Sequence, residues 1–283
     1  MAALTDLSDV INRLTGGNNG TPEFVSIYKP TRYSNATMPN GSVVQNKWQS
    51  VWQQDGSPGA GSAPTSGAIP TRSTNGALPF TAAGSTREKW PISLTFNATT
   101  AGNFLLYDRL YHIGGLSGTS TVDQTVQGAT PSPALTRNTS GSGNCIWYEV
   151  YATLGTTQVT ITATYTNQAG TTGRTATTVI GGANNNSRGR FQRFVLQTGD
   201  SGVQAVEKIK LSGSTGTIGN FGITIGQPIL YMPVIVAGGS FVKDFTTGLP
   251  WNSINNDSCL AFAYMASSTT PVGIEGNLIF IEK

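Results

Sequence analysis

Charged side chains are scarce in this sequence. Lysine, arginine, aspartate and glutamate make up 11% of its 283 residues, against about 25% in an ordinary soluble domain. The formal net charge is only +3, so the chain lacks the concentrated basic stripe with which nucleic-acid-binding proteins neutralise phosphates. The charge of the whole chain therefore argues against nucleic acid as a partner. The shortage of glutamate and lysine also disfavours long helices.

Histidine and cysteine are rarer still. The sequence has one histidine, His112, and two cysteines, Cys145 and Cys259. These numbers exclude a multi-histidine metal centre, a zinc site of cysteines alone and a disulfide-dense scaffold. Two small buried thiols explain the cysteines better than a disulfide does, although the spacing leaves pairing open.

Catalytic motifs are also missing. His112 stands between Tyr111 and Ile113 without a recognisable nucleophile or orienting partner, and the glycine-rich run 216–222 lacks the Lys-Ser/Thr of a phosphate-binding loop. We expect no enzymatic activity, no cofactor and no metal. Only a carboxylate pair assembled by the fold, as in glycosidases, would restore an enzymatic interpretation.

Long hydrophobic runs are absent. No apolar run approaches the ~20 residues of a membrane-spanning helix. The N-terminal sequence MAALTDLSDV has neither the basic start nor the apolar centre of a signal peptide. We expect the chain to fold in a cytoplasm and to make no contact with a membrane.

Turn-forming and β-favouring residues fill the chain instead. It contains 35 glycines and 14 prolines, and threonine, serine and asparagine occupy most other polar positions, as suits strands and tight turns. Apolar residues alternate with threonines over 157–166, the pattern of a half-buried antiparallel strand, and 174–180 follows as its hairpin partner. In 145–154 both faces carry large side chains, which predicts a central strand or one under an interface. Further strands are expected at 91–97, 191–197, 203–211, 221–225, 229–236, 259–266 and 277–282.

Many short strands separated by glycine-rich turns indicate an all-β protein of the β-sandwich or jelly-roll type, with antiparallel sheets. Residues 104–113 (FLLYDRLYHI) fit either a strand or a short helix, and we favour a helix. The predicted organisation is an N-terminal helical arm at 1–20, an extended Gly/Ser/Pro-rich segment at 21–90 and a β-sandwich domain at 91–283. Within the extended segment, Trp48 and Trp52 are interpreted as packing residues rather than as a carbohydrate platform.

One short helix is predicted over residues 4–14. Its apolar residues recur three and four positions apart and therefore share a face; they are Leu4, Leu7, Val10, Ile11 and Leu14. So short a helix is marginal alone in water, so this face needs a partner. Packing on the chain's own domain and docking onto another subunit both satisfy it, and the hinge-like GGNNG at 16–20 favours docking.

The densest basic cluster lies in 184–194, where Arg188, Arg190 and Arg193 interleave with two phenylalanines. Arginine beside aromatic rings pairs with carboxylates or stacks on bases. Three interpretations are open: a solvated loop that leads into a strand, a contact with an acidic protein surface, and a contact with nucleic acid. We assign the three arginines to partner contact as a hypothesis.

Several stretches resemble a family of virion structural proteins of tailed bacteriophages. The stretches are YTNQAGTTGRT (165–175), LQTGDSGVQAVEKIKLSG (196–213), QPILYMPV (227–234) and the N-terminal LTDLSDVINRLTGG (4–17). The likeness covers the helix and roughly 145–282, while 21–140 is more individual. It implies a head-associated protein of the capsid decoration (cement) type, and no catalytic residues.

The sequence therefore predicts a protein that decorates and stabilises the outside of a phage capsid, as a homotrimer attached to the major capsid protein and assembled in the host cytoplasm. The five apolar residues of the predicted helix are then the candidate capsid contacts. Two other roles stay open: a receptor- or glycan-binding module, and a tail or baseplate component.

Overall fold

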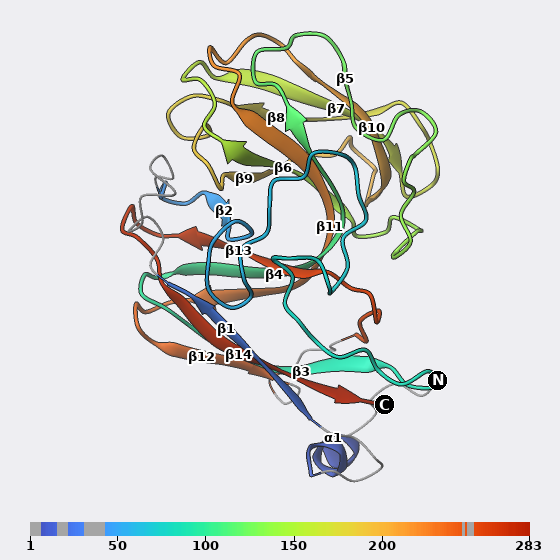
Figure 1. Cartoon of the computed structure of the whole chain (residues 1–283), viewed down its shortest axis with the longest axis vertical. Helices are drawn as coiled ribbons and strands as arrows, with labels where there is room; N and C mark the ends of the chain where they lie inside the picture. Colours follow the sequence, from blue (N-terminus) through green and yellow to red (C-terminus); the bar gives the residue numbers. More distant parts are fainter. Residues whose placement is uncertain (1–6, 16–21, 31–42, 245–246, 248–251) are drawn as a thin grey trace.

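The computed structural model describes residues 7–15, 22–30, 43–244, 247 and 252–283. Within these ranges the chain forms one helix and fourteen strands. The strands make three sheets, here called A, B and C, in which every strand pairing is antiparallel (Figure 1). The predicted all-β antiparallel fold is confirmed.

Sheet B lies at the centre of the molecule and closes on itself. Its strands, in spatial order, are β2 (Trp48–Ser50), β13 (Leu260–Ala266), β4 (Gly102–Leu116), β11 (Asn220–Val234), β6 (Cys145–Ala152) and β9 (Phe191–Arg193). The two edge strands meet, because Gln49 forms a bridge with Arg190 and the Ser50 amide donates to the Gly189 carbonyl at 2.8 Å. The sheet therefore has an inner and an outer surface.

The inner surface of sheet B is filled by large side chains. Phe191 stacks on Trp147 with ring centroids 5.2 Å apart and on Tyr107 at 5.4 Å. Cys145 and Cys259 belong to the same cluster as buried free thiols, as expected. Strand β6 is buried on both faces and lies between β11 and β9, so the prediction of a central strand is confirmed.

Sheets A and C pack on the outer surface of sheet B and make two sandwiches. Sheet A has the order β1 (Glu23–Lys29), β14 (Ile274–Glu282), β3 (Lys89–Ala98) and β12 (Ser240–Asp244). Sheet C has the order β5 (Gln124–Thr125), β10 (Val203–Leu211), β7 (Val159–Asn167) and β8 (Arg174–Ile180). Each sandwich has its own core, and the 15-residue strands β4 and β11 contribute to both (Figure 1).

Strand β4 corrects one prediction. Residues 104–113, interpreted above as a helix, lie in the middle of this strand. Nine of the ten are buried, and a bulge lies near Leu110, where the pairing with β11 shifts register. A strand that is buried on both faces shows no alternation of apolar and polar residues, so its sequence resembles a helix as much as a strand.

Strand β11 corrects the prediction of two separate strands in this part of the chain. The segments 221–225 and 229–236 form one strand rather than two, with register shifts on either side of Pro228. A bulge is where a strand tolerates proline. Strand β9 ends at Arg193, earlier than expected, because the chain then leaves sheet B and Val195 bridges Thr177 of sheet C. By contrast, β8 and β10 have the predicted bounds.

The segment before β3 covers one end of the interior of sheet B. Trp52, only 3% exposed, packs there beneath the glycine-rich stretch, so its interpretation as a packing residue is confirmed. A Cβ atom on Gly61 would lie 2.4 Å from the Trp52 indole, and one on Gly76 2.9 Å from it. Glycine is therefore required where this segment crosses the ring. The division of the chain at residues 20 and 90 stays a prediction.

Candidate functional site

Helix α1 (Leu7–Leu14) is fixed to the end of sheet A (Figure 1). Its one buried residue, Val10, is 4% exposed and clusters with Trp90 and Ile281. Asp9 accepts hydrogen bonds from Lys283 Nζ at 2.7 Å and from Arg13 Nε at 2.9 Å. The hydrogen bond from Lys283 is the main reason why the pKa of Asp9 is lowered. The helix therefore packs on its own domain, as the first interpretation of its apolar face required.

Three apolar residues of the same helix do not take part in that packing. Leu7 and Ile11 are each 49% exposed and Leu14 is 38% exposed. Their spacing of four and three residues places them on one stripe of the helix, which we call the α1 ridge. Leu4, the fifth predicted contact, and the glycine-rich 16–20 segment lie outside the described residues. The α1 ridge keeps the docking interpretation open for part of the face.

The adjoining surface of sheet A is also apolar in places. On its edge strand β1, Phe24 is 65% exposed and Tyr28 is 50% exposed. Phe24 lies opposite Ile279 of β14, which packs against the cluster beneath the helix. Sheet A therefore carries exposed apolar side chains of its own, on edge strand β1.

The arginine cluster is not one surface. Arg190 is only 1% exposed and donates from Nη1 to the Trp48 carbonyl, where β9 meets β2. Arg188 is half-buried and donates to Gln53 Oε1 at 3.0 Å. Arg193 alone of the three is exposed. In this single chain only Arg193 is positioned to reach a partner, and the other two join elements within the fold.

A polar cluster lies inside sheet B. Arg109 Nη1 pairs with Glu149 Oε2 at 2.7 Å, and both side chains are at most 1% exposed. The guanidinium also donates to Tyr151 Oη at 2.7 Å and stacks over Trp52, with Cζ 4.3 Å from the ring centroid. Buried charges need such paired and hydrogen-bonded surroundings.

His112 belongs to the same cluster. Its Nδ1 accepts a hydrogen bond from Arg109 Nε at 2.9 Å, and its ring meets Trp52 edge-on. Burial, followed by the nearby Arg109 charge, lowers the pKa of His112 to about 2. The imidazole is therefore neutral, with one nitrogen occupied, and it is 7% exposed, so it has the environment of a packing residue.

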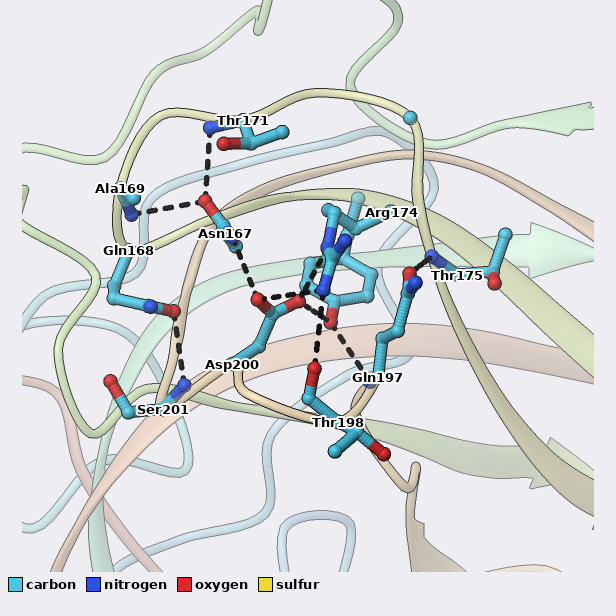
Figure 2. Close-up of polar contacts among 12 residues, drawn as sticks. Asn167, Gln168, Ala169, Thr171, Arg174, Thr175, Gln197, Thr198, Asp200 and Ser201 are labelled. Carbon is cyan, nitrogen blue, oxygen red and sulfur yellow. Dashed lines mark hydrogen bonds and ion pairs between the residues drawn. The ribbon is translucent and has the colours of Figure 1, made fainter.

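A second polar cluster lies at the tip of sheet C and centres on Asp200 (Figure 2). The carboxylate accepts hydrogen bonds from Tyr165 Oη, from Asn167 Nδ2 at 2.7 Å and from Arg174 Nε at 2.9 Å. The Arg174 hydrogen bond is the largest of the effects that lower the pKa of Asp200 to about 2. Gln168 Oε1 accepts from the Ser201 amide and ties the two loops together once more.

The Asp200 cluster joins two of the stretches on which the family resemblance rests. Tyr165, Asn167 and Arg174 come from 165–175, and Asp200 comes from 196–213. Sequence reasoning did not single out Asp200, because a carboxylate with internal partners has no local pattern. The only available signal was that both stretches are rich in polar residues at a turn.

Metal-binding and membrane-spanning features are not found in the described part of the chain. No group of three or more His, Cys, Asp and Glu side chains there could hold a metal ion. No helix in those ranges is long and apolar enough to cross a membrane.

No protein-family model matches this sequence, and a search of curated proteins gives no match. Among solved structures, weak similarity is found to infectious bursal disease virus. Its VP2 subviral particle is 11% identical, with 93% of this chain and 80% of that chain covered and a TM-score of 0.18. Its T13 viral particle is 10% identical, with 93% and 77% covered and a TM-score of 0.16. Both are structures of virus particles. TM-scores this low give no support for a shared fold or function.

Proposed function

We propose that this chain is a structural protein of a virus particle, and specifically that it decorates the outer surface of a tailed-phage capsid as a homotrimer bound to the major capsid protein. The observation that carries the proposal is the α1 ridge. Leu7, Ile11 and Leu14 point away from the domain on a helix that Val10 and two ion-paired residues fix in place.

A fixed apolar ridge suits attachment to a lattice. Fully burying a leucine or isoleucine contributes about 1.5–3 kcal/mol, and these residues are only about half exposed. One helix therefore gives a weak contact. Three helices in a trimer would act together, because the second and third contacts form at high effective concentration.

Two further features support a virion role. Two of the four stretches that resemble phage virion proteins, 165–175 and 196–213, form one hydrogen-bonded unit around Asp200, as expected if the resemblance reflects a shared structural element. The low content of charged residues, 11%, fits a protein that binds through area rather than through charge.

The capsid contact is tested by binding to expanded capsids of the encoding phage that lack this protein. The triple variant Leu7→Ser, Ile11→Ser, Leu14→Ser should bind at least about 100-fold more weakly, because every helix of a trimer loses its contact. Asn12→Ala, an exposed polar position on the same helix, is the matched control and should bind like the unmodified chain. Undiminished binding of the triple variant would exclude the α1 ridge as the contact.

Copy number per particle distinguishes the head from the tail. A decorating protein should be present in hundreds of copies, and a tail or baseplate component in tens or fewer. Quantitative mass spectrometry of purified particles measures this ratio. Light scattering of the free protein tests the trimer, and a mass of 29.6 kDa at all concentrations would contradict it.

A further inference from the structure

A cavity of about 300 Å³ lies between the two sandwiches, on the outer surface of sheet B. It is lined by Asp108 of β4 and by Gln227 of β11, which are register partners. On one side of this pair, Leu106 and Leu230 belong to the core between sheets A and B. On the other side, Tyr111 and Ile225 belong to the core between sheets B and C. The cavity therefore occupies the gap where neither core fills the surface of sheet B.

A buried ion pair forms part of the cavity wall. Arg137 donates to Asp108 from Nε and from Nη2, each at 3.0 Å, and both residues are 5% exposed. Asp108 also accepts from Ser258 Oγ at 2.9 Å and from the Cys259 amide at 2.8 Å. Four donors saturate this carboxylate, so it is not available as a catalytic base or a metal ligand.

The guanidinium of Arg137, in contrast, is not saturated. Nη2 also donates to the carbonyls of Pro70 and Arg109, at 2.9 and 3.0 Å. Nη1 is buried and has no acceptor among the described residues. A buried donor without a partner is costly and therefore uncommon in folded proteins. Nη1 has almost no accessible surface, so a molecule in the cavity meets the other groups of the wall and not this nitrogen.

The remaining cavity wall is neutral. Amide side chains come from Asn138, Gln227 and Asn252, and a hydroxyl comes from Ser253, while Pro228 and Ile254 add apolar surface. Asp108 and Arg137 cancel each other's charge, and no other charged residue lines the described part of the cavity. Amides and hydroxyls beside an apolar wall match a ligand that carries many hydroxyl groups and one apolar face.

We infer that this cavity binds one neutral hexose unit of a glycan, with sugar hydroxyl groups pairing with the side-chain amides of Gln227 and Asn252. Small-ligand pockets measure about 300–1,000 Å³, and this one lies at the lower limit, so it suits a single ring rather than an extended chain. The inference goes beyond capsid attachment and does not depend on it, because the α1 ridge and the cavity share no residue.

The test uses the full chain on an array of neutral and anionic glycans, followed by calorimetric titration with the monosaccharide that binds. Gln227→Ala and Asn252→Ala each remove an amide from the wall and should weaken binding about fivefold. Ser253→Trp should abolish binding by filling the cavity. Gln158→Ala, an exposed amide outside the cavity, is the control and should leave the affinity unchanged.

Several outcomes would overturn the inference. One is that no neutral saccharide binds to the unmodified chain. Another is that binding persists in Ser253→Trp while circular dichroism shows the variant to be folded. A third is that only carboxylated or phosphorylated glycans bind, with an affinity that falls as salt is added. Capsid binding by Ser253→Trp should be unaffected, so failure here is distinguishable from failure of the proposed function.

Discussion

The interior of sheet B and the α1 ridge both contain apolar side chains, but these are buried inside sheet B and half exposed on the ridge. Inside sheet B, aromatic rings stack, Arg109 has Glu149 as its counter-ion and His112 accepts from Arg109. On the α1 ridge, Leu7 and Ile11 stay half exposed. The interior therefore determines stability, while the ridge contributes little to the fold and is available for binding.

The largest expected effect comes from breaking the ion pair inside sheet B. Glu149→Gln leaves the Arg109 charge buried without a counter-ion, and we expect the free energy of unfolding to fall by about 3–5 kcal/mol. Urea denaturation at pH 7 measures it. The double variant Arg109→Met, Glu149→Leu removes both charges and should be more stable than Glu149→Gln. A Glu149→Gln variant as stable as the unmodified chain would show that the interior tolerates a lone charge.

The next largest effect is a pH dependence that originates in the same interior. The pKa of His112 is about 2 in the folded chain, against 6.5 ordinarily. Between these values the unfolded chain binds a proton that the folded chain does not, so stability falls as the pH drops below 6.5. The loss between pH 7.5 and pH 5 should be about 2 kcal/mol.

Urea denaturation across this pH range tests the pH prediction. Because the sequence has one histidine, His112→Gln should flatten the dependence while keeping an oxygen acceptor for Arg109. A slope that is unchanged in this variant would assign the titration to another group.

A smaller and local effect is expected at the tip of sheet C. Asp200→Asn removes the charge that holds Arg174 and should increase amide hydrogen exchange in 167–171 and 197–201, with less loss of global stability than Glu149→Gln. In the unmodified chain the same stabilisation should be lost as the pH falls from about 3.8 toward about 2, since the pKa of Asp200 is lowered to about 2. Exchange rates equal to those of the unmodified chain would contradict this role.

The smallest effect on stability is expected at the α1 ridge. Leu7→Ser, Ile11→Ser and Leu14→Ser together should change the free energy of unfolding by no more than about 0.5 kcal/mol per substitution, because exposed positions contribute little. Val10→Ser is the contrasting variant and should release the helix from sheet A. If the ridge variant were as destabilised as Val10→Ser, the ridge would be part of the core.

The sequence predicted most readily the strands that have one face toward solvent, although β6, which is buried on both faces, was also found. Strands β7, β8 and β10 were found because apolar and polar residues alternate along them. Strand β4 was missed because both of its faces are buried, so its apolar residues do not alternate with polar ones and also fit a helix. The closure of sheet B was missed as well, because it depends on contacts between two three-residue strands that are far apart in the chain.

For the candidate site, the sequence identified the helix face but not which of its residues are exposed. Helical spacing identified the apolar face of α1, but only the structure separates Val10, which is buried, from Leu7 and Ile11, which are not. The arginine cluster looked like one surface because Arg188, Arg190 and Arg193 are close in sequence. Arg190 is buried where β9 approaches β2, and no local pattern reveals such a closure.

The long strands β4 and β11 have a mechanical consequence. They are paired with each other along most of their length and run from the sandwich with sheet A into the sandwich with sheet C. A pull that separates the two sandwiches acts along these strands, so many hydrogen bonds carry the load in parallel instead of opening one after another. The chain should therefore resist stretching along this direction and unzip more readily at sheet A's edge strand, β1.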